Sequence, residues 1–181
     1  MRIISGLLKG RIVKGINIDG TRPTMDRVKE SMFAIIQNNI KNSTCLDLFG
    51  GSGSLGIEAI SNGANISYFV DNNKTAIKII KENLTNLNIL DKSAIINKDY
   101  NSALNYFKNN NIKFDVIFID PPYNMQIIND ILEYISLNNL LNTNGIIVCE
   151  TDELYLKSEI KNLVKYKEKK YGSTYLTFYK N

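Results

Sequence analysis

The chain has 181 residues, the size of one ordinary domain, so a catalytic unit and a separate substrate domain would not both fit. Its 44% hydrophobic and 22% charged residues are typical of a folded globular protein and argue against disordered, fibrous and membrane classes. The formal net charge is +4, and the absence of His excludes a His general base and His-based metal centres.

Neither the cysteines nor the hydropathy indicates an exported protein. Cys45 and Cys149 lie far apart in separate apolar runs, so they form no paired-thiol metal site or redox motif, and we predict that both are buried and reduced. The N-terminus lacks the apolar core of a signal peptide, and no run approaches the roughly 20 apolar residues that span a bilayer. We expect a cytoplasmic monomer that uses no metal and binds no membrane.

Basic side chains concentrate at the N-terminus. Residues 1–27 hold six basic residues, among them all four Arg of the chain, against Asp19 and Asp26, whereas the remaining residues balance to zero. The guanidinium of Arg binds phosphates and base edges in a bidentate way that Lys does not match. We predict that residues 1–20 form a basic RNA-binding arm, a small hairpin in which Arg2 and Arg11 contact phosphates; a merely solvated charged segment is the alternative.

From Gly20 onward, helical and strand patterns alternate. Residues 25–40 carry apolar side chains at helical spacing, and Thr24 is a suitable N-cap. Apolar runs predict strands at 44–49, 66–71, 93–97, 114–120 and 145–150, and the helices between them are expected to end near 62 and to span 74–87, 102–108 and 126–136. Such alternation is typical of a doubly wound α/β domain with a mostly parallel sheet, here over residues 21–181.

The C-terminal residues follow a different pattern. Residues 163–167 and 174–179 alternate apolar and polar side chains around Gly172 and Ser173. We predict a closing antiparallel hairpin, which brings the expected sheet to seven strands.

The turn after the first strand has the features of a nucleoside-binding site. Gly51, Gly53 and Gly56 form G-x-G-x-x-G between a strand and a helix, and Asp71 ends the next strand, where a carboxylate can accept from ribose hydroxyls. The glycine pattern alone also fits NAD, or a tight turn without a ligand. S-adenosylmethionine is favoured because it carries an ammonium, a sulfonium and no pyrophosphate, and the nearby carboxylate of Asp47 suits such a cation.

Asp99 follows the third predicted strand and leaves two roles open. Its carboxylate can accept from the adenine amino group of the cofactor, or it can cap the next helix.

The second candidate site is D-P-P-Y, residues 120–123, directly after the apolar strand FDVIFI. An exocyclic amino group is a poor nucleophile, and hydrogen bonds from its N–H groups to the Asp120 carboxylate and the Pro121 carbonyl favour a more tetrahedral nitrogen. Pro122 restricts that carbonyl, and the ring of Tyr123 can stack on the base. Positioning beside an electrophilic methyl then provides most of the catalysis, although a plain Pro-Pro turn remains the alternative.

At this point the sequence resembles the RsmD family of 16S rRNA guanine-N2 methyltransferases. The resemblance rests on RIISGLLKGR, RPTMDRVKESMF, DLFGGSGSLGIEAISNGA, DPPY and YGSTYLTFY, which together extend over nearly the whole chain. It implies a Rossmann-like class I methyltransferase that acts on one guanine of 16S rRNA, as naked RNA or in the assembling 30S subunit. It further implies the catalytic residues Asp120, Pro121, Pro122 and Tyr123, the S-adenosylmethionine contacts Asp47, Leu48, Phe49, Gly51, Gly53 and Asp71, and the RNA contacts Arg22, Thr24 and Arg27. We add Asn72, next to Asp71, and Asp99 in the first of its two roles as expected cofactor contacts.

Three other functions each account for only part of these features. D-P-P-Y also occurs in DNA adenine-N6 methyltransferases, but the chain has no room for their usual recognition region. A non-catalytic rRNA-binding assembly factor would not need Asp47, Asp71 and D-P-P-Y. A NAD oxidoreductase would lack both a second domain and a His proton relay.

Overall fold

The computed structural model describes residues 1–16, 26–122, 127–152 and 156–181. Its described strands form one sheet of eight, in the order β3-β2-β1-β4-β5-β8-β7-β6. The parallel part comprises β1 (Thr44–Asp47), β2 (Ile66–Asp71), β3 (Ser93–Asn97), β4 (Phe114–Ile119) and β5 (Leu141–Thr151). The antiparallel part comprises β6 (Glu159–Ile160), β7 (Leu163–Tyr171) and β8 (Thr174–Lys180).

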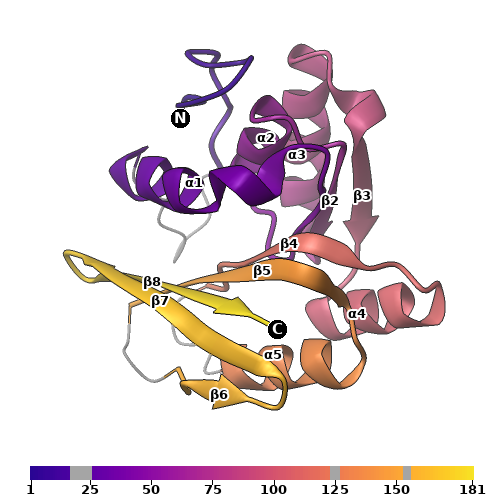
Figure 1. Cartoon of the computed structure of the whole chain (residues 1–181). Helices are drawn as coiled ribbons and strands as arrows, with labels where there is room; N and C mark the ends of the chain where they lie inside the picture. The colour runs from indigo at the N-terminus through magenta and orange to yellow at the C-terminus, as the bar shows by residue number, and fades with distance from the viewer. Residues whose placement is uncertain (17–25, 123–126, 153–155) are drawn as a thin grey trace.

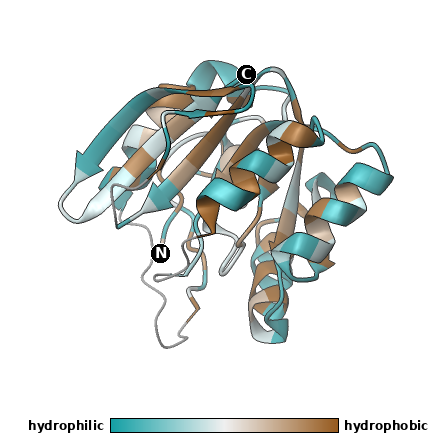
Figure 2. Cartoon of the chain, turned by 90° about the horizontal axis from the view of Figure 1, so that it is seen from below, coloured by the Kyte–Doolittle hydropathy of each residue, from teal (hydrophilic) through white to brown (hydrophobic). Residues whose placement is uncertain are grey.

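Helices cover both faces of the sheet, as a doubly wound fold requires (Figure 1). One face carries α1 (Asp26–Ile40), α2 (Ser54–Ser61) and α3 (Lys74–Asn86), and the other carries α4 (Tyr100–Asn109) and α5 (Ile128–Leu137). A short 3-10 turn, η1 (Leu90–Lys92), leads into β3. Hydrophobic residues run along the central strands and hydrophilic ones along the outer sides of the helices (Figure 2), so the core lies in two layers between sheet and helices.

The predicted α/β class, the parallel sheet and the C-terminal hairpin are confirmed, with local differences. The first strand ends at Asp47 instead of residue 49, because the chain turns there into the glycine loop. The fifth strand begins at Leu141, before the apolar run that predicted a strand from residue 145. Its first residue pairs with Phe114 of β4. The eighth strand, β6, has only two residues and leaves no periodic signal in the sequence.

The N-terminal residues form a hairpin-like turn that packs on the domain. Arg2 and Ile12 form an isolated antiparallel bridge, and the Ile3 amide donates to the Arg11 carbonyl at 3.0 Å. Ile3 and Val13 are each only 2% exposed and share a hydrophobic cluster with α2, β2 and α3. Residues 1–16 therefore share their core with the rest of the fold. Thr24, the predicted N-cap of α1, lies outside the described residues.

Both cysteines are free and buried, as predicted. None of the described helices combines the length and the apolar character that crossing a bilayer requires.

Candidate active site at the carboxyl ends of the central strands

The two sequence-predicted sites meet where the strand order reverses. From β1 the chain continues outward through β2 and β3, then returns to the other side of β1 to form β4 and β5. Because β1 and β4 are parallel neighbours, with Asp47 opposite Phe118, the glycine loop and the Asp-Pro-Pro segment leave the sheet at the same edge. The Leu48 amide donates to the Phe118 carbonyl at 3.1 Å and extends this pairing by one residue. Such a switch point is where open α/β sheets bind ligands.

Positive φ angles give the glycine loop its shape. Gly51 has φ 53° and Gly53 has φ 82°, a left-handed region that residues with a Cβ rarely adopt. The Gly50 amide donates to the Val70 carbonyl at 2.7 Å and fixes the loop to β2. The backbone is therefore held open where a ligand can approach it closely.

Gly56 has a packing role at the start of α2. A Cβ at this position would lie 2.3 Å from Cε1 of Phe69, well inside van der Waals contact. The third glycine of the motif thus allows α2 to approach β2, while Gly51 and Gly53 shape the turn.

Asp47 lies inside the protein. Its side chain is 2% exposed, and its Oδ2 accepts a hydrogen bond from the Gly56 amide at 3.0 Å. Burial raises the pKa of the Asp47 carboxyl to about 8, against the lowering effect of that hydrogen bond, and the charges of Asp120 and Asp71 raise it further. A cation placed beside Asp47 would favour its ionised form.

Asp71 ends β2 and links two loops. Its Oδ2 accepts from the Gly51 amide at 2.9 Å, and its Oδ1 accepts from the Asn73 amide at 2.8 Å. Each oxygen keeps a further lone pair for a ligand hydroxyl. Asn72 follows at the exposed start of the β2–α3 connection, and Asn73 caps α3.

Asp99 is the N-cap of α4. Its Oδ1 accepts from the Ser102 amide at 3.0 Å and its Oδ2 from the Ser102 hydroxyl at 2.6 Å, and these bonds lower the pKa of the Asp99 carboxyl. The helix-cap alternative is thereby confirmed. Beside it, the rings of Phe49 and Tyr100 lie 5.7 Å apart and join the glycine loop to α4.

Asp120 and Pro121 follow β4 and are partly buried, and Pro122 is exposed. Tyr123, the predicted stacking residue, lies outside the described residues. Three carboxylates, those of Asp47, Asp71 and Asp120, thus lie near one another at the ends of three adjacent strands. Among the described residues, no group of three or more potential ligands is arranged to hold a metal ion.

The predicted RNA contacts are only partly described. Arg2 is exposed and its Nε lies 3.2 Å from Asp26, while a terminal nitrogen of Arg11 donates to the Asn86 carbonyl at 3.1 Å. Arg27 is exposed and has no ion pair with any described residue. Arg22 and Thr24 fall in the part of the chain that the structure does not describe.

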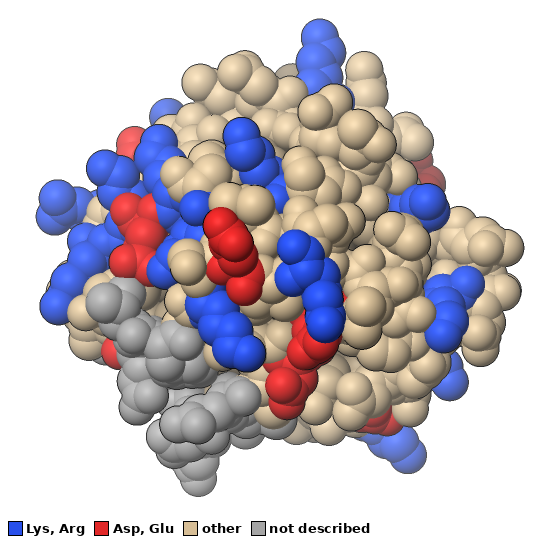
Figure 3. Space-filling view, turned by 60° about the horizontal axis from the view of Figure 1, so that its bottom comes forward, with Lys and Arg blue, Asp and Glu red and all other residues tan. Residues whose placement is uncertain are grey.

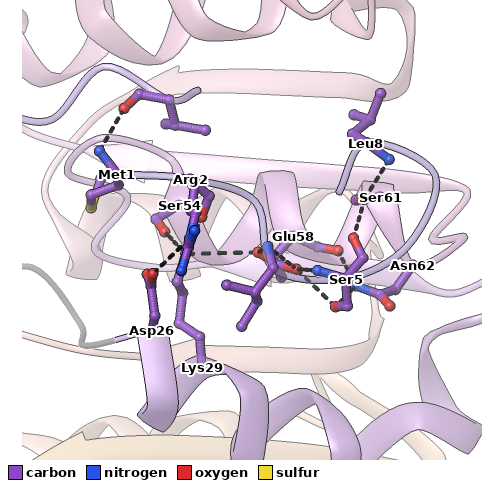
Figure 4. Close-up of polar contacts among 12 residues, drawn as sticks. Met1, Arg2, Ser5, Leu8, Asp26, Lys29, Ser54, Glu58, Ser61 and Asn62 are labelled. Atoms are coloured by element: carbon purple, nitrogen blue, oxygen red, sulfur yellow. Dashed lines mark hydrogen bonds and ion pairs between the residues drawn. The ribbon is translucent and has the colours of Figure 1, made fainter. Parts of the chain in front are cut away.

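A buried ion pair beside this site was missed by the sequence analysis. Lys29 of α1 is 1% exposed and Glu58 of α2 is fully buried, with 3.7 Å between the ammonium and the carboxylate (Figure 4). Lys29 also donates to the Arg2 carbonyl at 3.0 Å and to the Ser54 hydroxyl at 3.1 Å. Glu58 accepts from the amide and the hydroxyl of Ser5, both at 2.8 Å.

This pair therefore joins three segments: the N-terminal residues, α1 and the helix that starts at the glycine loop. The signal in the sequence was the position of Lys29, which precedes Met32, Phe33 and Ile36 by three, four and seven residues and so lies on the apolar face of α1.

Comparison with known proteins agrees with the geometry. A family described as "Conserved hypothetical protein 95" matches residues 1–180. The "Ribosomal RNA small subunit methyltransferase D" of Haemophilus influenzae is 38% identical over 100% of this chain and 94% of its own, and that of Escherichia coli is 30% identical over 90% and 76%. The solved structure of the Escherichia coli protein yhhF superposes with a TM-score of 0.85 at 27% identity, covering 99% of this chain and 96% of the other.

A more distant structure shares the fold alone. It is that of an RNA methyltransferase from Salinibacter ruber in complex with S-adenosyl-L-homocysteine, with a TM-score of 0.66 and 13% identity over 87% of this chain and 92% of the other. The extent and identity of the closer matches show that the chain belongs to the ribosomal RNA small subunit methyltransferase D family.

Proposed function

We propose that this protein transfers a methyl group from S-adenosylmethionine to the N2 amino group of one guanine in 16S rRNA. The observation that carries the proposal is the arrangement of Asp47, Asp71 and Asp120 at neighbouring strand ends on the switch point, in a chain whose relatives are named as small-subunit rRNA methyltransferases.

The residues at this edge fit S-adenosylmethionine. Asp71 has acceptor capacity for ribose hydroxyls, and Gly51 and Gly53 place no side chain over the loop. A nearby cation would stabilise the ionised form of the buried Asp47 carboxyl. The methionine part of the cofactor carries an ammonium and a sulfonium that can supply this charge. The name of the Salinibacter ruber complex supports the same cofactor class. When bound, the cofactor supplies an electrophilic methyl group.

The chain itself positions the base. Asp120 and the Pro121 carbonyl accept from the two N–H groups of the guanine amino nitrogen and orient its lone pair, with Tyr123 stacked on the ring. Alkylation leaves an acidic ammonium-like nitrogen, whose proton Asp120 or water removes, so a chain without His can complete the reaction. The guanine has to be splayed out of an RNA loop to reach this edge.

The test is methyl transfer by an Asp120→Ala variant. Wild type and variant are assayed with labelled S-adenosylmethionine on 16S rRNA, on assembled 30S particles and on duplex DNA, and cofactor binding is measured by calorimetry. We expect Asp120→Ala to lose about 100-fold or more in rate while it retains cofactor binding. Asp91→Ala, at an exposed carboxylate before β3, is the matched control and should be fully active. Full activity of Asp120→Ala, or transfer to duplex DNA alone, would refute the proposal.

A further inference from the structure

A second basic region lies at the C-terminus. It is not apparent from the net charge of the chain. Residues 163–181 carry five Lys and one Glu, while residues 28–162 carry 11 basic and 15 acidic side chains. The acidic excess of the middle cancels the basic excess of the end. The interpretation that positive charge belongs to the N-terminal segment alone is therefore wrong.

The fold presents these lysines on an outer edge. Strand β6 pairs only with Leu163 and Val164, so most of β7 borders the sheet without a neighbouring strand among the described residues. Lys167, Lys169, Lys170 and Lys180 are exposed. The first three lead toward the turn at Gly172 and we call them the hairpin lysines, whereas Lys180 lies at the other end of β8, opposite Ile146. In Figure 3, basic side chains gather at the left of the molecule, where the tip of the β7–β8 hairpin lies in Figure 1.

The charge of the hairpin lysines is not neutralised by any described carboxylate. Glu168, the single acidic residue of the hairpin, forms an ion pair with Lys165, with 3.0 Å between the ammonium and the carboxylate. The ammonium of Lys170 lies 5.0 Å from the centroid of the Tyr175 ring, and that of Lys180 lies 5.4 Å from that of Tyr166. Aromatic rings orient an ammonium without cancelling its charge.

The tip of the hairpin lies at the edge of the sheet that carries the candidate active site. Thr151, at the carboxyl end of β5, pairs with Tyr175 at the start of β8, so the turn at Gly172 projects from this same edge. The Tyr171 hydroxyl hydrogen-bonds with the Ser31 hydroxyl of α1. Arg27 precedes Ser31 by four residues and therefore lies on the same side of the helix, one turn nearer to its start.

We infer that the hairpin lysines, continued by Arg27, form a second RNA-binding surface that contacts the phosphates of rRNA around the target loop. This inference rests on the proposed function. It adds a docking surface in the C-terminal hairpin, whereas the predicted RNA-binding arm comprises residues 1–20. Charge complementarity favours RNA: Lys167 and Lys169 lie two residues apart on an extended strand, Lys170 follows directly, and such a row of uncompensated ammonium groups matches a chain of phosphates. Lys on an edge strand also prevents pairing with other chains, and that role requires polarity but no phosphate contact.

The test measures binding to 16S rRNA made by transcription, as a function of NaCl concentration. The triple variant K167Q/K169Q/K170Q keeps a polar edge and removes three charges. The control K92Q/K108Q/K113Q removes three exposed charges near the amino ends of β3 and β4, at the opposite edge of the sheet. Both variants should retain the melting temperature of the wild type.

We expect the hairpin triple to weaken binding about tenfold or more, and to flatten the slope of log affinity against log salt by about 2 to 3, because each phosphate contact adds roughly 0.7 to 0.9. The control should keep the wild-type slope. An unchanged slope in the hairpin triple, or equal flattening in both triples, would overturn the inference. Weaker binding to 30S particles with unchanged binding to naked 16S rRNA would also overturn it, in favour of a protein partner.

The methyl-transfer assay separates this inference from the proposed function. At low salt and saturating rRNA the hairpin triple should reach the wild-type maximal rate, with a raised KM. If wild type methylates rRNA but the slopes do not differ, only the hairpin inference fails. If wild type methylates no RNA, the proposed function fails, and the salt slopes still decide whether the hairpin binds RNA.

Discussion

The ammonium of Lys29 on α1 lies 3.7 Å from the carboxylate of Glu58 on α2, and both side chains are excluded from solvent. A carboxylate left in this position without its partner would keep only neutral donors, those of Ser5 and Ile4. We expect Lys29→Met to lower the free energy of unfolding by about 3 to 5 kcal/mol, the usual cost of breaking a buried pair. Denaturant titration measures this cost.

The exposed pair of Lys14 and Glu82, at 2.9 Å, provides the control. Lys14→Met should cost no more than about 1 kcal/mol. The double variant K29M/E58Q should recover part of the loss, since a neutral amide can still accept from Ser5. Equal costs for Lys29→Met and Lys14→Met would show that the buried pair does not hold these segments together.

The raised pKa of Asp47 predicts the sign of a pH dependence. Its folded pKa of about 8 lies above the ordinary value of 3.8, so between these values the folded protein holds a proton that the unfolded chain has released. This contribution to stability is fully present below the ordinary pKa and is lost as the pH rises toward 8, by at most about 1.4 kcal/mol per pH unit. Urea unfolding from pH 5 to pH 8 should show the decline in wild type and not in Asp47→Asn.

Binding of a cationic cofactor should depend on the same proton. If S-adenosylmethionine places positive charge beside Asp47, the bound state favours the carboxylate, so binding releases a proton and tightens from pH 6 toward pH 8. Calorimetry in buffers of different ionisation enthalpy counts the proton released. The chain has no His to obscure the signal, and Asp47→Asn removes the contribution of this group while the N-terminal amine remains. Identical proton release in Asp47→Asn would contradict the role given to Asp47.

Gly56 leaves the least space for a side chain among the three glycines of the G-x-G-x-x-G motif. Gly56→Ala would place a methyl 2.3 Å from the Phe69 ring and should cost about 1 to 3 kcal/mol or more, with weaker cofactor binding as α2 shifts. Gly15→Ala, where a Cβ meets nothing within 4 Å, is the matched substitution and should change neither quantity. Thermal unfolding measures the stability of the two variants, and calorimetry measures their cofactor binding. Equal stability and equal cofactor affinity in Gly56→Ala and Gly15→Ala would contradict the packing role of Gly56.

Arg27 has neither an ion pair nor a side-chain hydrogen bond with any described residue, whereas Arg2 pairs with Asp26 and Arg11 donates to the Asn86 carbonyl. Arg27→Gln should weaken rRNA binding and reduce the salt slope by about 1, as expected for one lost phosphate contact. Lys41→Gln, just beyond the far end of α1, should leave the slope unchanged. A wild-type slope in Arg27→Gln would remove this residue from the RNA-binding surface.

The sequence predicted those features that repeat along the chain. Alternating apolar runs and helical patterns predicted the mostly parallel sheet, and the positions of the glycines and of D-P-P predicted two binding loops, each directly after a strand. Strand β6 was not predicted, because its two residues are too few to show the alternation of apolar and polar side chains that identifies a strand.

Features that depend on tertiary neighbours could not be read in the same way. The sequence indicated that the carboxylate of Asp47 suits a cation, but it did not indicate that this carboxylate is buried and accepts from the Gly56 amide. The partner of Lys29 could not be predicted from the sequence, since Glu58 is 29 residues away. The basic hairpin was hidden because a sum over 154 residues removes the contrast between an acidic middle and a basic end.

The most direct measurement is a map of methylated nucleosides in 16S rRNA from cells with the gene intact, deleted, or carrying Asp120→Ala. We predict that one N2-methylguanine disappears on deletion, stays absent with Asp120→Ala, and returns with the wild-type gene. An identical set of methylated guanines in all strains, or the loss of a methyl group from a different base or from DNA instead, would contradict the proposed reaction.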